Sequence, residues 1–209
     1  MLENNIVLYS KINLQKQKII KLEKLKYFDK KYNVDFSIIE SGDKLGNNQF
    51  HGYGYEPSYP INTILLHYNI TQNDNIVDLG SGKGYALHMF CKYSFGKICG
   101  VECNKNLFDI SVNNLSKLHP NDTRIELFCE DVMNWEYFGK FNYFYLFNPF
   151  DEYVVGYVAS CIKNSADERK KQVIVIYQAP KHKDVFLKYG FVIEISCNIN
   201  MVLRYEPRK

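Results

Sequence analysis

Arginine is scarce in this 209-residue sequence, and the overall charge is small. Only four of the 26 basic residues are arginine, and the formal net charge is +3. Arginine is the side chain that binds phosphate or guanine through two parallel hydrogen bonds. Its scarcity and the weak net charge therefore do not, on charge alone, favour a nucleic-acid partner.

The sequence also lacks the cysteine spacing of a metal or redox site. Its six cysteines form no Cys-x-x-Cys pair, and no histidine stands at zinc-ligand spacing from them. We therefore expect reduced, mostly buried thiols and no metal ion. The histidines do not pair with a cysteine or serine as in a nucleophile dyad, and only His51 is a candidate base.

Membrane and export signals are missing as well. No apolar run approaches the roughly 18 residues that a membrane span requires. The N-terminus does not show the basic and then apolar pattern of a signal peptide. We expect a soluble, cytoplasmic protein without a membrane partner. The sequence does not indicate an oligomeric state.

The first 50 residues differ in composition from the rest. Residues 1–35 are rich in lysine and isoleucine and contain no glycine or proline, which predicts a helix from Ser10 to Tyr32. Ile12, Ile19 and Leu22 are expected on its buried side. Turn-forming residues follow at 36–59. We expect a helical extension and linker at 1–50 and one main domain at 51–209. The lysines form either a solvated face, the favoured interpretation, or a surface for an acidic partner or a nucleic acid.

Apolar strands and helical segments alternate from residue 61 onward. Strands are predicted at 76–79, 97–102, 124–129, 141–147 and 172–177, and a final hairpin at 191–197 and 201–205. The first five are apolar on both faces, which is typical of a parallel sheet covered by helices on either side. The expected fold is an α/β three-layer sandwich. Its seven-stranded sheet is mostly parallel, with an antiparallel C-terminal hairpin.

Polar residues stand at the ends of the predicted strands. In such sheets the ligand binds beyond the carboxyl ends of the strands, where the strand order reverses. Asp78 and the alternating Gly80, Gly82 and Gly84 follow the first strand. Tyr85 stands where the dinucleotide fingerprint requires its third glycine, which argues against an NAD-dependent oxidoreductase. Other strand ends supply Glu102, suited to ribose hydroxyls, Asp131, suited to an adenine amino group, and Asn148.

These motifs resemble those of the class I, seven-stranded S-adenosylmethionine-dependent methyltransferases over residues 51–209. The resemblance implies S-adenosyl-L-methionine as cofactor, with a set of binding residues at the strand ends: Asp78, Gly80, Ser81, Gly82, Gly84, Glu102, Asp131, Val132 and Asn148. A finer similarity, carried by Tyr55 to Ser58 and the glycine loop, links the chain to the non-SET protein-lysine methyltransferases and small bacterial relatives.

Asn148-Pro149-Phe150 is the candidate acceptor site. Amino-directed methyltransferases of this class carry Asp/Asn-Pro-Pro-Tyr/Phe after the fourth strand, where the Asn oxygen and a proline carbonyl accept hydrogens from the target amine. This chain has one proline there, so a simple proline-capped turn is the alternative. Tyr55 lies in a tyrosine-rich loop and completes the predicted catalytic set. Tyr53 and Tyr177 are expected to line the pocket with Tyr55 and Phe150.

The expected function is methyl transfer to a nitrogen acceptor, either a protein side chain or a small-molecule amine. Two alternatives stay open. One is a nucleic-acid methyltransferase acting on a base amine, with the lysine helix as an electrostatic guide and Phe150 stacking on a flipped base. The other is a non-catalytic protein that binds S-adenosylmethionine. The sequence does not name the acceptor.

Overall fold

The computed structural model describes residues 18–38, 59–197 and 199–207. Its strands are β1 (Asn75–Leu79), β2 (Lys97–Val101), β3 (Ile125–Phe128), β4 (Tyr143–Phe147), β5 (Val173–Gln178), β6 (Val192–Cys197) and β7 (Asn200–Tyr205). Its helices are α2 (Tyr59–Leu66), α3 (Tyr85–Phe90), α4 (Lys105–Leu118), α5 (Glu152–Arg169) and α6 (Lys183–Lys188), with a 3-10 turn η2 (Tyr137–Lys140). A further helix covers residues 18–32. Within these ranges, no helix combines the length and apolarity needed to cross a bilayer.

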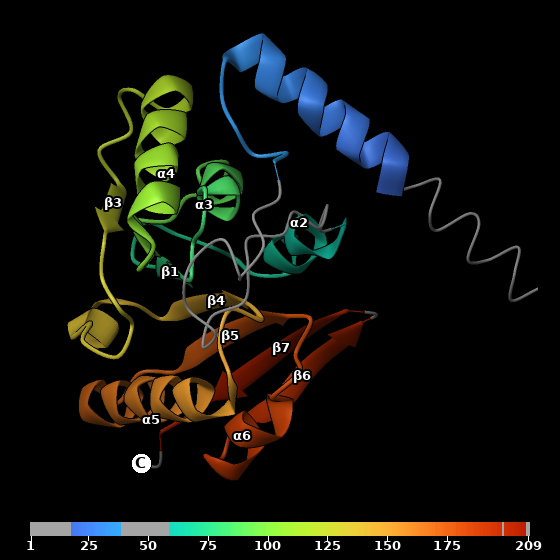
Figure 1. Ribbon diagram of the computed structural model, residues 1–209. Coiled ribbons are helices and arrows are strands. Elements are labelled where there is room, and N and C mark those ends of the chain that lie inside the picture. Colours follow the sequence, from blue (N-terminus) through green and yellow to red (C-terminus); the bar gives the residue numbers. More distant parts are fainter. Residues whose placement is uncertain (1–17, 39–58, 198, 208–209) are drawn as a thin grey trace, which may run out of the picture.

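One seven-stranded sheet runs through the molecule in the order β3-β2-β1-β4-β5-β7-β6. The first five strands are parallel, and β7 runs antiparallel to both β5 and β6. Figure 1 shows α5 and α6 on one face and α2, α3 and α4 on the other. Both the three-layer architecture and the terminal hairpin are therefore as predicted. Because β1 lies between β2 and β4, the strand order reverses there, and the crevice opens at the carboxyl ends of β1 and β4.

Each face of the sheet has its own apolar core. Val77, Phe144 and Val175 pack towards α5, with the buried ring of Trp135 beside them. Residues one position along the same strands, such as Ile76, pack towards α2 and α3. Both sets are buried, which explains why the strands appear as continuous apolar runs rather than alternating patterns. Burial on both faces fixes the strand register, and the register fixes where each polar strand end lies.

The helix at residues 18–32 packs through a different stripe from the one predicted. Ile19 is 60% exposed, so its predicted burial is wrong, and Ile12 lies outside the described residues. The buried line passes instead through Leu25 and Asp29. Asp29 Oδ2 accepts hydrogen bonds from the N–H groups of Phe36 and Ser37 at 3.0 and 2.7 Å. These bonds turn the chain back after the helix, and the reversal selects the helix face that is buried.

Candidate active site

The glycine loop after β1 requires glycine at each of its alternating positions. Gly80, Gly82 and Gly84 have φ values of 84°, 53° and 82°, in the left-handed region. A Cβ atom on Gly80 would lie 2.5 Å from Pro149 Cβ, and one on Gly84 would lie 2.6 Å from Ser111 Oγ. The N–H groups of Gly80 and Ser81 both donate to the carbonyl of Val101, at 2.9 and 3.0 Å. The loop is therefore closely packed against the ends of β2 and β4.

Glu102 connects this loop to the start of α4. Its Oε2 accepts a hydrogen bond from Gly82 N–H at 2.8 Å, and its Oε1 accepts one from Asn104 N–H at 2.8 Å. Burial raises the pKa of Glu102 in spite of these bonds, which lower it. The structure thus gives Glu102 a role in ordering the loop that the sequence did not predict. Cys103 Sγ also donates to Oε1, at 3.8 Å, whereas Oε2 keeps a second lone pair, and ribose binding stays a prediction.

Asp78 ends β1 inside the protein and is 3% exposed. Its Oδ1 has no hydrogen-bond partner in the described part of the chain. Burial, and then the charge of Glu102, raise its pKa well above the usual value. An unpaired buried carboxylate is costly, and a cation placed beside it removes most of the cost. The site therefore fits the ammonium group of S-adenosylmethionine, which Asp78 would hold.

The Asn148–Phe150 segment lies directly against the glycine loop. Asn148 has a φ of 41°, a left-handed conformation that asparagine tolerates better than most residues. Its Oδ1 is buried and has no hydrogen-bond partner among the residues described. Pro149 packs on Gly80. Phe150 is 3% exposed and its ring belongs to the core beneath α5, so it lies in the wall of the site and not on a surface.

The remaining predicted residues have different settings. Asp131 Oδ1 accepts a hydrogen bond from Met133 N–H at 2.9 Å, and Val132 is buried in the core on the α5 side. Tyr177 is also a core residue, packed edge-on against Phe186 at 5.8 Å between ring centroids. Tyr55 lies outside the described residues. The same holds for the loop residues Tyr53 and His51.

Sequence reasoning missed Lys83, which lies within the glycine loop and is completely buried. Its Nζ donates to Asp35 Oδ2 at 2.8 Å and to the Ile38 carbonyl at 3.0 Å. The fully buried Asn114 of α4 donates to the carbonyls of Asp35 and Lys83 and accepts from Asp35 N–H. These bonds fasten residues 35–38 to the glycine loop. The one available signal was Asn114 itself, a polar residue at helical spacing from Leu107 and Leu118.

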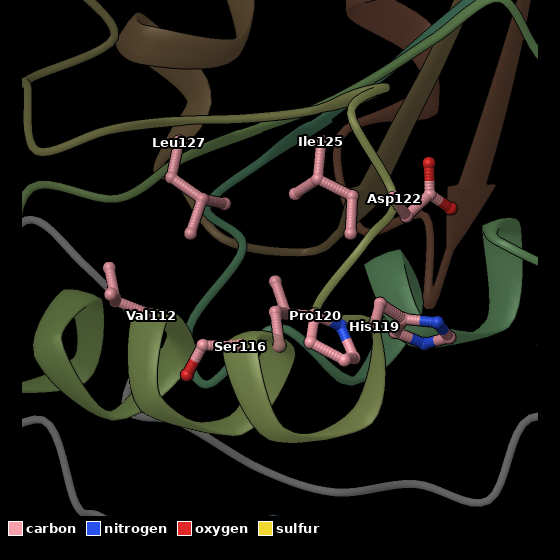
Figure 2. A pocket seen from close by; sticks show the side chains of 8 residues that line it. Val112, Ser116, His119, Pro120, Asp122, Ile125 and Leu127 are labelled. Carbon is pink, nitrogen blue, oxygen red and sulfur yellow. The ribbon is translucent and has the colours of Figure 1, made fainter.

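A hollow of about 300 Å³ lies away from this crevice, between α4 and β3. Figure 2 shows Val112 and Ser116 of α4 facing Ile125 and Leu127 of β3 across it. His119 and Asp122 lie at its rim beside the sheet edge. The hollow lies at the β3 edge of the sheet, and β2 and β1 separate β3 from β4 and the Asn148–Phe150 segment that follows it. Its lining contains none of the predicted site residues.

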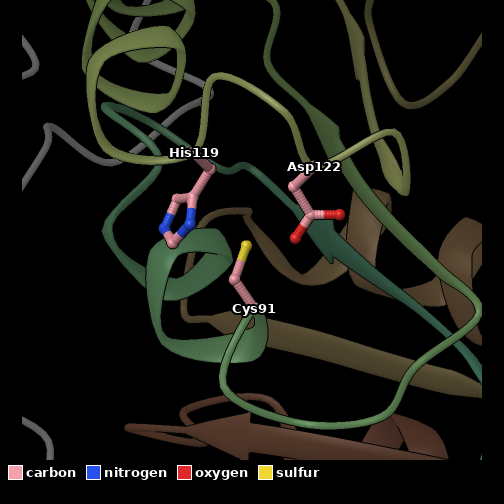
Figure 3. Close-up of side chains that lie close together, drawn as sticks. All are labelled: Cys91, His119 and Asp122. Atoms are coloured by element: carbon pink, nitrogen blue, oxygen red, sulfur yellow. The ribbon is translucent and has the colours of Figure 1, made fainter.

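Cys91, His119 and Asp122 converge next to this hollow (Figure 3). Their potential ligand atoms lie within 4.8 Å of one another. Asp122, however, already binds Arg124 through both oxygens, at 2.8 and 2.6 Å, and His119 Nε2 is hydrogen-bonded to His88 Nδ1 at 2.8 Å. Burial and the charge of Asp122 raise the pKa of Cys91 to about 12, which disfavours the thiolate that metals bind. The hydrogen bonds to Arg124 and His88 account for the positions of Asp122 and His119 without a metal ion.

Protonation of the partly buried His88 should make the stability of the folded protein depend on pH. Burial, and then His119, lower its pKa from 6.5 to about 4. The unfolded chain therefore binds more protons than the folded chain between these values, and stability falls as pH decreases from 6.5 to 4. The expected loss is roughly 2–3 kcal/mol. Denaturant unfolding of His88→Gln should lack this part of the pH slope, and exposed His67→Gln should keep it. An unchanged slope in His88→Gln would contradict the assignment.

Similarity to known proteins agrees with this fold. The model of the ribosomal RNA adenine dimethylase family matches residues 53–182. An rRNA adenine N-6-methyltransferase of Escherichia coli is 25% identical over 83 residues, which cover 40% of this chain and 32% of the relative. The match thus spans about a third of that relative's length.

Solved structures show the same architecture at low sequence identity. An RNA methyltransferase from Salinibacter ruber, in complex with S-adenosyl-L-homocysteine, has a TM-score of 0.51 and 15% identity, covering 75% of this chain and 95% of its own. An rRNA methylase from Streptococcus thermophilus has a TM-score of 0.54 and 13% identity, covering 74% and 100%. The fold is that of the class I S-adenosylmethionine-dependent methyltransferases. The match to the ribosomal RNA adenine dimethylase family covers more than half of the sequence, so the chain belongs to this family.

Proposed function

We propose that this enzyme methylates the exocyclic N6 amine of adenine in RNA. The observation that carries the proposal is the family match over residues 53–182, which contain both the glycine loop and the Asn148–Phe150 segment. The contact between Gly80 and Pro149 supports it, because it places the acceptor segment beside the donor loop. A protein side chain or a small-molecule amine, our expectation from the sequence, offers the same nitrogen chemistry, but the family match favours RNA.

Each polar strand end then has a role. Bound S-adenosylmethionine supplies a methyl group on a sulfonium, an electrophile open to in-line attack. Asp78 holds the donor's ammonium, Glu102 its ribose hydroxyls and Asp131 its adenine. Asn148 Oδ1, buried and without a partner in the described chain, accepts a hydrogen bond from the target amine. The amine nitrogen is thereby oriented with its lone pair directed to the methyl group, so that positioning supplies most of the catalysis.

The helix at residues 18–32 is the proposed RNA guide. It contains six lysines and two acidic residues, a net charge of +4, whereas the whole chain carries only +3 and the other residues together −1. Lys24, Lys30 and Lys31 are exposed, and Tyr27 on the same helix is 70% exposed. Clustered lysines attract phosphates without reading sequence, and exposed rings can stack on bases. The bonds from Asp35 and Asn114 to the glycine loop hold this helix close to the donor site.

Reversing the charge of exposed lysines tests the proposed role of the helix at residues 18–32 as an RNA guide. In the triple variant Lys24→Glu, Lys30→Glu and Lys31→Glu, we expect RNA affinity to fall and the slope of log K against log salt to decrease by about 2–3. Fluorescence anisotropy with a labelled RNA hairpin measures both. A matched control changes the exposed Lys181, Lys183 and Lys188 to glutamate. Equal losses in the two triple variants would show that only net charge matters and would refute the guide.

Partition of a labelled methyl group tests the function itself. The chain is incubated with methyl-tritiated S-adenosylmethionine and a cell extract that is then separated into RNA, DNA, protein and small molecules. We expect the label in RNA. Label confined to the protein or small-molecule fraction would favour the amine acceptors instead and overturn the proposal.

A further inference from the structure

Two buried amide side chains lie side by side near the acceptor segment. Gln178 ends β5 and Asn200 begins β7, and the two are directly paired across the strands. Gln178 is also paired with Phe147 of β4, the residue before Asn148. Gln178 lies two positions after Ile176, and Asn200 lies two positions before Val202. Ile176 and Val202 pack on the α2 and α3 face of the sheet, so both amides share that face. Gln178 is 0% and Asn200 2% exposed.

Most of the hydrogen-bonding capacity of these amides is unused. Gln178 Oε1 accepts a hydrogen bond from Tyr145 O–H at 2.6 Å, but its Nε2 has no partner within the described chain. Neither Oδ1 nor Nδ2 of Asn200 has one. The buried Asn142 at the other end of β4 is different: it accepts from Asn75 N–H at 2.8 Å and donates to Asp74 Oδ1 at 2.7 Å. Buried polar atoms without partners are rare and costly in native proteins.

We propose that Gln178 and Asn200 bind the edge of the acceptor base and select adenine, an inference that rests on the proposed function. A side-chain amide presents a donor beside an acceptor, which matches the adjacent amine and ring nitrogen of adenine. Asn200 has both groups free, and Gln178 adds further donors from Nε2. Asn148 directly follows Phe147, the β4 residue paired with Gln178, and accepts a hydrogen bond from the target amine, so all three amides come from neighbouring strand ends. Gln178 and Asn200 are then specificity-determining residues.

Asn200→Val separates a ligand-binding role from a structural one. Valine removes two unpaired polar atoms from the interior and suits a strand, so the melting temperature should stay the same or rise. Asn142→Val is the matched control, because it breaks two satisfied hydrogen bonds far from the crevice, and it should melt at a lower temperature. Base binding should weaken in Asn200→Val and stay unchanged in Asn142→Val.

The probe is adenosine monophosphate, titrated into the chain saturated with S-adenosylhomocysteine and followed by the side-chain amide resonances of Gln178 and Asn200. We expect both resonances to shift with adenosine monophosphate and not with inosine monophosphate, whose base carries a carbonyl in place of the amine. Asn200→Val should weaken adenosine monophosphate binding at least tenfold and leave S-adenosylhomocysteine affinity unchanged. Asn142→Val should keep both affinities.

Two outcomes would overturn the inference: wild-type resonances that do not move with adenosine monophosphate, or an Asn200→Val variant that melts early and binds the nucleotide normally. Failure of the proposed function gives a different result. Adenine binding that depends on Asn200, together with label in a fraction other than RNA, would refute RNA methylation and retain the base-binding amides.

Discussion

Gly80→Ala is expected to weaken donor binding severely. The new Cβ would lie 2.5 Å from Pro149 Cβ, a separation that real Cβ atoms do not tolerate, at a φ of 84° that alanine rarely adopts. The left-handed backbone costs about 1–2 kcal/mol and the overpacking a further 1–3 kcal/mol. Pro149 is ring-constrained, so relief must come from moving one loop away from the other. Calorimetric titration with S-adenosylhomocysteine should show affinity weakened at least about a hundredfold.

Gly139→Ala is the matched control for this change. A Cβ at Gly139 meets no atom within 4 Å. This variant should bind the cofactor as the unchanged chain does. If Gly80→Ala also binds normally, the close approach of the glycine loop to the acceptor segment is not needed for donor binding, and the site as described is wrong.

Loss of the Asn148 side chain is expected to reduce turnover about a hundredfold or more with little loss of donor affinity. The reason is that its Oδ1 has no partner in the described structure and is proposed to bind the acceptor amine. Asn148→Gly is the more informative variant, because glycine keeps the φ of 41° without strain and removes only the amide. Single-turnover kinetics on unmethylated substrate RNA separates the chemical step from binding.

Asn148→Ala completes the test. Alanine also loses the amide but is less tolerant of the left-handed backbone, so it should show the same catalytic loss with an added loss of stability. Turnover that falls in Asn148→Ala and stays normal in Asn148→Gly would mean that Asn148 only shapes the turn, which is the alternative that the sequence left open.

The fold could be predicted because it follows from local patterns. Strands apolar on both faces, separated by helices, allow few arrangements other than a covered parallel sheet. The positions of Asp78, Glu102 and Asn148 at strand ends followed from the same reasoning, since parallel strands deliver their carboxyl ends to one edge. The contact between Gly80 and Pro149 confirms that these ends converge.

Features that depend on distant packing could not be predicted. Lys83 appears in the sequence as a solvated loop residue, and only the return of residues 35–38 onto the loop buries it. Phe150 appears as a free ring, but α5 covers it. The pairing of Gln178 with Asn200 depends on the antiparallel register of β7 against β5, which single residues do not encode. The amides proposed to bind the base were therefore visible in the sequence only as strand-end polar residues.

Identification of the methylated nucleoside tests the central claim most directly. RNA labelled by the purified chain with S-adenosylmethionine is digested to nucleosides and analysed by chromatography and mass spectrometry. We predict that the label elutes as N6-methyladenosine or N6,N6-dimethyladenosine and that Asn148→Gly abolishes it. Label at a ribose hydroxyl or a ring carbon, or label that persists in Asn148→Gly, would contradict an adenine-amine acceptor held at this site.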